Sequence, residues 1–245
     1  MTDAVSPPVQ PMSLVARFMG IITAPRATYE NVVAVPRPFG ILFASILLFS
    51  VAAIIPQMTE SARTQMLEAQ VKGMERFGVT VTPEVYQRME ASSKSMTSKV
   101  IGIVWSLVMF PILALILTAI FWAFFNAILG GTATFKQVLA VTSHSYVITA
   151  LGAIAALPVL LIKFKLAMGG PFNLGALAPF LDPASTLHRF LSGVNLFSLW
   201  AWANVSIGLA VLYRRSSTTI TIVLLIFSLL FTYAMTAIFG SFMGG

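Results

Sequence analysis

Five long apolar runs without a charged residue limit what this chain can fold into. They cover residues 39–55, 100–129, 138–162, 190–213 and 216–243. Each run approaches or exceeds the roughly 20 residues with which a helix crosses the hydrocarbon core of a bilayer. Since a single apolar segment in hydrocarbon can satisfy all its backbone hydrogen bonds only as a helix, the sequence predicts an all-α integral membrane protein, a five-span transmembrane helical bundle.

Composition and charge agree with this class and exclude others. Of the 245 residues, 58% are hydrophobic and 9% are charged, whereas an average soluble domain has about 25% charged residues. The formal net charge is +7, but the basic residues are scattered over loops and flanks without a stripe of interleaved aromatics. We therefore expect contact with anionic lipid and no nucleic-acid partner. The chain has no cysteine, which excludes disulfides and thiolate metal sites.

Two segments outside the runs carry helical patterns of their own. Residues 1–38 read as a polar tail and an interfacial amphipathic lead-in. Its apolar face is formed by Leu14, Val15, Phe18, Ile21 and Ile22. Residues 57–98 read as an extramembrane helical hairpin between spans one and two, with Thr82 as the N-cap and Pro83 as the first residue of its second helix. Residues 39–245 then form the membrane domain, which contains this external hairpin.

The connection between spans two and three is short and carries two helix signals. Gly130 and Gly131 follow the second run and are typical of a helix end. Thr134 and Gln137 have the spacing of a capping box, in which each side chain pairs with the other residue's backbone N–H. These signals predict a tight antiparallel pair of helices.

The sequence contains few residues that could be catalytic or bind a metal, and we expect that the protein is not an enzyme and binds no metal or cofactor. The five runs contain no Asp, Glu, Lys or Arg, and the two histidines, His144 and His188, fall on opposite sides of the proposed bundle. No pattern in the chain supplies a nucleophile with its base, a phosphate loop or a metal-ligand set. We therefore predict no catalytic, metal or cofactor-binding residue.

Polar residues inside membrane spans are functional candidates, although interhelical hydrogen bonding is the commoner reason for them. The candidate intramembrane polar cluster consists of His144, Asn204, Trp122, Asn126 and Asn195. His144 and Asn204 each lie nine residues from the proposed inner end of their spans, about 14 Å deep. We expect a neutral His144 that pairs or stacks with Asn204 or Trp122.

Small residues form a seam on the third span at helical spacing. The seam consists of Ser145, Thr149, Gly152 and Ala156. Small side chains let helix backbones approach closely in a membrane. The seam therefore predicts helix packing, either within one subunit or between subunits.

Two stretches resemble a known family. "LGGTATFKQVLAVTSHSYVI" and "GVNLFSLWAWANVSIGLAVLYRRS" are similar to the Yip domain family (Ypt-interacting proteins), and "GIITAPRATYENVVAVPRP" resembles the lead-in of its prokaryotic members. The resemblance implies five spans, a cytoplasmic N-terminus and an external C-terminus, whereas the basic residues alone are nearly balanced between the two sides. Eukaryotic members are associated with Rab GTPases, but only about 37 residues precede the first span here. The resemblance therefore points to a prokaryotic-type member in the inner (cytoplasmic) membrane.

Two functions remain open on these grounds. The first is a non-catalytic integral membrane adaptor or organiser, which binds other membrane proteins or itself, or shapes the bilayer. The alternative is a permease or lipid-handling component that uses the polar residues between the spans. A continuous polar cavity reaching His144 or Asn204 would favour transport, and close packing around both would favour the adaptor.

Overall fold

The computed structural model describes residues 10–162, 170–183 and 185–239 of the chain. Within these ranges every regular element is a helix, and the one β-type contact is an isolated bridge between Asn173 and Asn195. Five helical segments are long and apolar enough to cross a membrane: Pro38–Met58, Met96–Ile128, Phe135–Ile162, Leu196–Tyr213 and Ser217–Ala234. The predicted five-span, all-α membrane fold is confirmed.

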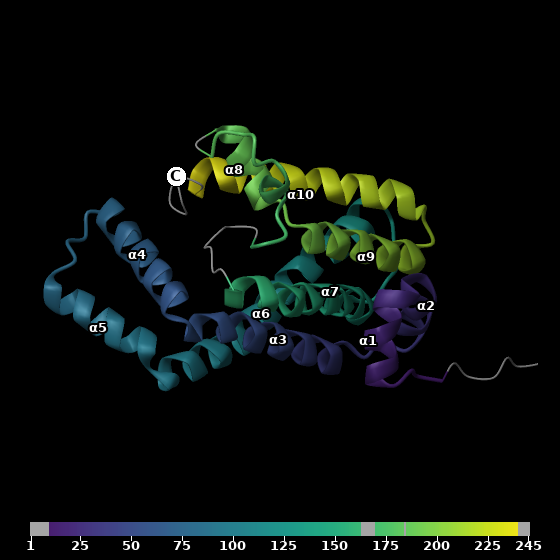
Figure 1. Cartoon of the computed structure of the whole chain (residues 1–245). Helices are drawn as coiled ribbons and strands as arrows, with labels where there is room; N and C mark the ends of the chain where they lie inside the picture. The colour runs from purple at the N-terminus through teal and green to yellow at the C-terminus, as the bar shows by residue number, and fades with distance from the viewer. Residues whose placement is uncertain (1–9, 163–169, 184, 240–245) are drawn as a thin grey trace, which may run out of the picture.

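The helix α7 (Phe135–Ile162) lies at the centre of the bundle (Figure 1). It contacts α3 (Pro38–Ile54), α6 (Met96–Ala123) and α9 (Leu196–Tyr213). Every residue from Val138 to Ser145 is buried. A helix that is covered on all sides needs neighbours all around it, and α7 has them because further helices pack across its first turns.

Those further helices are α1 (Leu14–Thr23) and α2 (Pro25–Ala34), which lie across one end of the bundle (Figure 1). They approach each other closely at Gly20, where an added Cβ would overlap the hydroxyl of Thr28. Ile21 and Tyr29 are fully buried, whereas Val15 is 69% exposed. The lead-in that we expected to lie at the membrane interface thus has an apolar outer face, and its inner face belongs to the core of the bundle.

The turn between α6 and α7 follows the predicted signals. A π-helix, η2 (Phe124–Ile128), continues α6, and Gly130 then takes a φ of +69°. The backbone N–H of Thr134 donates to Oε1 of Gln137 at 2.9 Å, and the backbone N–H of Gln137 donates to Oγ1 of Thr134 at 3.3 Å. This is the expected capping box, and α7 begins at Phe135.

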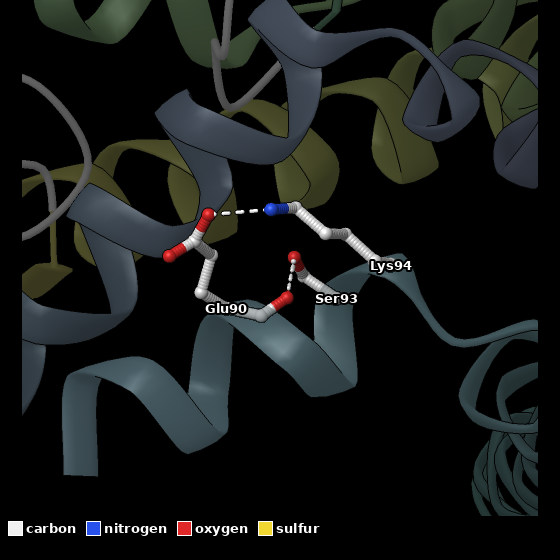
Figure 2. A network of polar contacts seen from close by, with 3 residues as sticks. All are labelled: Glu90, Ser93 and Lys94. Carbon is white, nitrogen blue, oxygen red and sulfur yellow. Dashed lines mark hydrogen bonds and ion pairs between the residues drawn. The ribbon is translucent and has the colours of Figure 1, made fainter. Parts of the chain in front are cut away.

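The hairpin that we expected outside the membrane consists of α4 (Glu60–Arg76) and α5 (Pro83–Lys94), and it projects from the end of the bundle opposite α1 and α2 (Figure 1). Thr82 caps α5, since its hydroxyl accepts from the backbone N–H of Val85. Figure 2 shows the end of α5, where the Nζ of Lys94 donates to the Glu90 carboxylate at 2.6 Å and the Ser93 hydroxyl donates to the Glu90 carbonyl at 2.7 Å. An exposed pair of this kind adds only about 0.3–0.5 kcal/mol to helix stability.

The fourth and fifth spans differ in extent from the sequence prediction. We expected span four to cover 190–213, but the structure ends a separate helix, α8 (Thr186–Gly193), before α9 begins at Leu196. Asn195 causes the break, because its side-chain oxygen accepts from the backbone N–H groups of Phe197 and Ser198. The last span is α10 (Ser217–Phe239), and positions 240–243 of the expected range lie outside the described residues.

Candidate functional site

The buried centre of the bundle holds a contact between Arg17 of α1 and His144 of α7. Nδ1 of His144 lies 2.6 Å from the carbonyl oxygen of Ala140. A carbonyl oxygen can only accept, so we assign the ring hydrogen to Nδ1. Nε2 then carries a lone pair, and it accepts from Nη1 of Arg17 at 3.4 Å. The arrangement is that of a neutral imidazole whose two nitrogens both have partners.

Arg17 is an unusual residue for this position, since it is only 6% exposed. Its Nη1 also donates to the carbonyl oxygen of Arg37 at 2.8 Å, and its Nε has no hydrogen-bond partner in the described part of the chain. The ion pairs between described residues are Arg26–Glu30 and Glu90–Lys94, so no described carboxylate balances the Arg17 guanidinium. Burial, and secondarily the charge of Arg37, lowers the pKa of Arg17 below its usual value.

Neutral acceptors hold this guanidinium, and they come from two different parts of the bundle. Arg37 stands just before the first residue of α3, and His144 lies near the end of the buried stretch Val138 to Ser145 of α7. A buried cation costs free energy unless its donors are paired. Arg17 therefore fastens α1 to the start of α3 and to α7 at once. Among the described residues the group forms a link between helices.

Tyr29 of α2 also contacts the His144 ring. Its ring meets the His144 ring edge to face, with centroids 6.4 Å apart and an interplanar angle of 65°. Its hydroxyl donates to the carbonyl of Val141 at 3.5 Å, which is a long hydrogen bond. A Cβ on Gly208 would lie 2.8 Å from the Tyr29 ring. The tyrosine thus lies between α7 and α9, and its ring fits there because Gly208 has no side chain. Burial raises the pKa of Tyr29.

Trp122 and Asn126 lie together at the turn that joins α6 to α7. The indole Nε1 of Trp122 and the Nδ2 of Asn126 both donate to the carbonyl of Ala133, at 3.0 and 2.7 Å. The hydroxyl of Tyr213, the last residue of α9, donates to Oδ1 of Asn126 at 3.0 Å. Both residues thus bind the free carbonyl of the turn, and Asn126 also ties the turn to α9 through Tyr213.

The partners of His144 therefore differ from those we expected. They are Arg17, Ala140 and Tyr29, and neither Asn204 nor Trp122 is among them. Trp122 uses its only donor at the turn. The expectation missed Arg17 because it considered only residues within the spans, whereas the partner comes from a helix that precedes them.

Asn204 and Asn195, both from the segment around α9, occupy different positions. Asn204 is 1% exposed, and its Oδ1 has no partner among the described residues. Asn195 lies at the start of α9, where it is the N-cap. Of the five polar residues proposed from the sequence, the structure brings together Trp122 and Asn126, which share the carbonyl of Ala133. The contacts of His144 with other helices are to Arg17 of α1 and Tyr29 of α2.

The small-residue seam of α7 faces α9 at one of its positions. A Cβ on Gly152 would lie 2.7 Å from Cγ of Phe197. Together with the contact between Gly208 and Val141, this fixes the antiparallel register of α7 and α9. In that register Asn204 lies level with Ser145, the first residue of the seam. The contact at Gly152 is therefore within one chain.

Sequence reasoning missed Arg17 and Tyr29, although a signal for Arg17 was present. Leu14, Arg17 and Ile21 follow each other at intervals of three and four residues, so Arg17 lies on the same helix face as the fully buried Ile21. A charge inside an apolar stripe indicates a buried partner. For Tyr29 no comparable signal exists, because its position depends on a glycine 179 positions further along the chain.

No cluster of three His, Cys, Asp or Glu side chains that could hold a metal ion occurs in the ranges that the structure describes. Within those ranges the site is a set of helix-fastening contacts.

The comparisons with known proteins agree with this architecture. The family model described as the Yip1 domain matches residues 19–239, which span α2 to α10 and the second half of α1. No curated protein and no solved structure matches the chain. Because the family model covers nearly the whole of a chain with five apolar spans, this integral membrane protein belongs to the Yip1 domain family.

Proposed function

We propose that the protein is a non-catalytic membrane adaptor or organiser, which acts by binding other membrane proteins or a second copy of itself, or by shaping the bilayer. The observation that carries this proposal is the close packing around the polar residues of the spans. His144 is 0% exposed and Asn204 is 1% exposed. A permease would need water or solute to reach such groups, since polar residues in a transport path line a cavity.

The cavities of the described residues support the same proposal. They have volumes of about 540, 680 and 830 Å³ and lie at the hairpin junction, at the α6–α7 turn and between α6 and α10. None of the three is lined by His144 or Asn204 in the described part of the chain. These three cavities are thus separate from the buried side chains of His144 and Asn204.

The surfaces available to lipid or to a partner lie mainly on α6 and α10. Only 6% of the residues in the most apolar stretch of the α6 segment are buried, and 17% in that of α10. Ile116 and Ile226 are 52% and 53% exposed on these two helices, whereas Ile148 of α7 is fully buried. By analogy with the family, we place this protein in a prokaryotic inner membrane with a cytoplasmic N-terminus and an external C-terminus.

A photo-crosslinking amino acid at Ile116 or Ile226 tests the proposal in the native membrane, with the same substitution at Ile148 as the matched control. We expect protein adducts, with a second copy or with a reproducible set of membrane proteins, at the two exposed positions and none at the buried one. Lipid adducts alone at both exposed positions, together with solute flux in vesicles that contain the purified protein, would contradict the adaptor and support the permease.

A further inference from the structure

A cavity of about 540 Å³ lies where the extramembrane hairpin joins the bundle. Its walls come from the end of α3 with η1 (Ile55–Met58), from α4 and α5, and from the first turns of α6. Because α3 ends and α6 begins here, the cavity lies at the level where a bilayer changes from acyl chains to headgroups. Ser50 and Ser106, whose hydroxyls meet at 2.5 Å, also line it.

Three cations from three different helices line this cavity. They are Arg63 of α4, Arg88 of α5 and Lys99 of α6, and no acidic side chain belongs to the described lining. Neither ion pair of the described residues includes any of these three. The cavity therefore carries a positive charge that no carboxylate in its described wall compensates.

Backbone carbonyls position two of the three cations. Nη1 of Arg63 donates to the carbonyl of Met58 at 2.6 Å, and Nζ of Lys99 donates to that of Ser93 at 3.0 Å. A carbonyl neutralises no charge, so each group keeps its full charge in a fixed place. These bonds hold both charges at the cavity, and an anion at Lys99 would replace one of its bonds to the carbonyls of Ser93, Lys94 and Ser95.

The remaining lining mixes serine and glutamine side chains with an apolar group that continues toward the spans. Phe49 and Ile54 come from α3, Leu67 from α4 and Met89 from α5. Phe49 precedes the last residue of η1 by nine positions, so this wall extends about 14 Å into the bundle if the rise is that of an α-helix. One end of the cavity suits an anionic group and the other suits a hydrocarbon chain.

We propose that this cavity binds an anionic glycerophospholipid, with its phosphate at Arg63, Arg88 and Lys99 and the start of an acyl chain against Phe49 and Ile54. A free phosphate would leave the apolar wall uncovered, whereas a phospholipid covers both parts. The charge at the cavity also favours a lipid with net negative charge over a zwitterionic one. The proposal does not depend on the adaptor function, because it concerns the hairpin junction alone.

The test is lipid binding to the full-length protein, measured by native mass spectrometry in detergent with phosphatidylglycerol and with phosphatidylcholine. We expect tighter binding of phosphatidylglycerol. Each of R63Q, R88Q and K99Q should weaken that binding about fivefold, since one cation near an anionic lipid contributes roughly 1 kcal/mol. Lys72→Gln is the matched control, because Lys72 is exposed on the same helix as Arg63 and does not line the cavity.

Thermal unfolding of each variant without added lipid separates lost binding from lost folding. The proposal requires melting temperatures near that of the wild type, together with a smaller upward shift on addition of phosphatidylglycerol. Equal binding of the two lipids by the wild-type protein would overturn the proposal, as would an equal loss in K72Q. Inorganic phosphate that stabilises the protein through the same three cations, without a preference for phosphatidylglycerol, would replace the lipid with a free anion and also overturn it.

Discussion

Replacing Gly208 with alanine puts a methyl group where α2, α7 and α9 leave no room for one. The added Cβ would lie 2.5 Å from Cγ1 of Val141 and 2.8 Å from Cε1 of Tyr29. Both neighbours are fully buried, so neither side chain can move aside into open space. Overpacking of a filled core costs about 1–3 kcal/mol. We expect Gly208→Ala to lower the free energy of unfolding by this amount.

Gly102→Ala is the matched control, because Gly102 also lies within a spanning helix but nothing lies within 4 Å of the Cβ it would gain. Alanine is favoured over glycine in a helix by about 0.5–1 kcal/mol. The two substitutions are thus expected to act with opposite sign. Thermal unfolding in detergent measures both, and a loss of 1 kcal/mol corresponds to a lowering of about 2–4 °C for a chain of this size.

A double variant shows whether the cause is the contact itself. Val141→Ala removes the nearest atom to the new methyl group, so V141A and G208A together should cost less than the sum of their separate effects, by at least about 0.5 kcal/mol. Equal melting temperatures for G208A and G102A, or strict additivity in the double variant, would refute the packing of α2 and α9 on α7 described above.

Four further substitutions test three other contacts. Arg17→Met leaves the acceptor nitrogen of His144 without its donor and should lower the free energy of unfolding by about 1–3 kcal/mol. Combining R17M with His144→Phe removes both partners, so the double variant should lose less than the sum of the two single losses when all are measured by thermal unfolding. Tyr213→Phe loses the hydrogen bond to Asn126 and should lower the stability by about 1 kcal/mol in the same assay; no change would mean that this bond is not formed. Thr82→Ala removes the cap of α5 and should cost about 1 kcal/mol locally, which hydrogen exchange of the α5 amides detects while the α7 amides stay unchanged; faster exchange in both helices would contradict a local effect.

The spans and their caps could be predicted from the sequence because the information is local. An uncharged apolar run is sufficient to indicate a membrane helix. The capping box of Thr134 and Gln137 and the cap at Thr82 involve residues only three positions apart, and the structure contains both. The break before α9 is equally local in origin, because Asn195 is the N-cap of α9 and not a residue within the span.

The candidate site could not be derived in the same way because its contacts join distant parts of the chain. Arg17 meets a histidine 127 positions away, and a charged residue near the N-terminus of a membrane protein normally indicates the surface. Its burial depends on the crossing of α1 over the ends of α3 and α7, which no local pattern specifies. The sequence did single out His144 as an important position, and the error was in its partners.

The proposed function requires that His144, Asn204 and the polar residues around them are sealed from water, and the lack of cysteine in the chain allows a direct measurement. Ser143→Cys and Ser206→Cys place single thiols at fully buried positions of α7 and α9, and Ser61→Cys places one on the exposed face of α4. In intact membranes with both faces supplied with a membrane-impermeant maleimide, we predict labelling of the S61C variant alone, with S143C and S206C labelled only after denaturation. Labelling of S143C or S206C in intact membranes at a rate near that of S61C would show an aqueous path through the bundle and contradict the account.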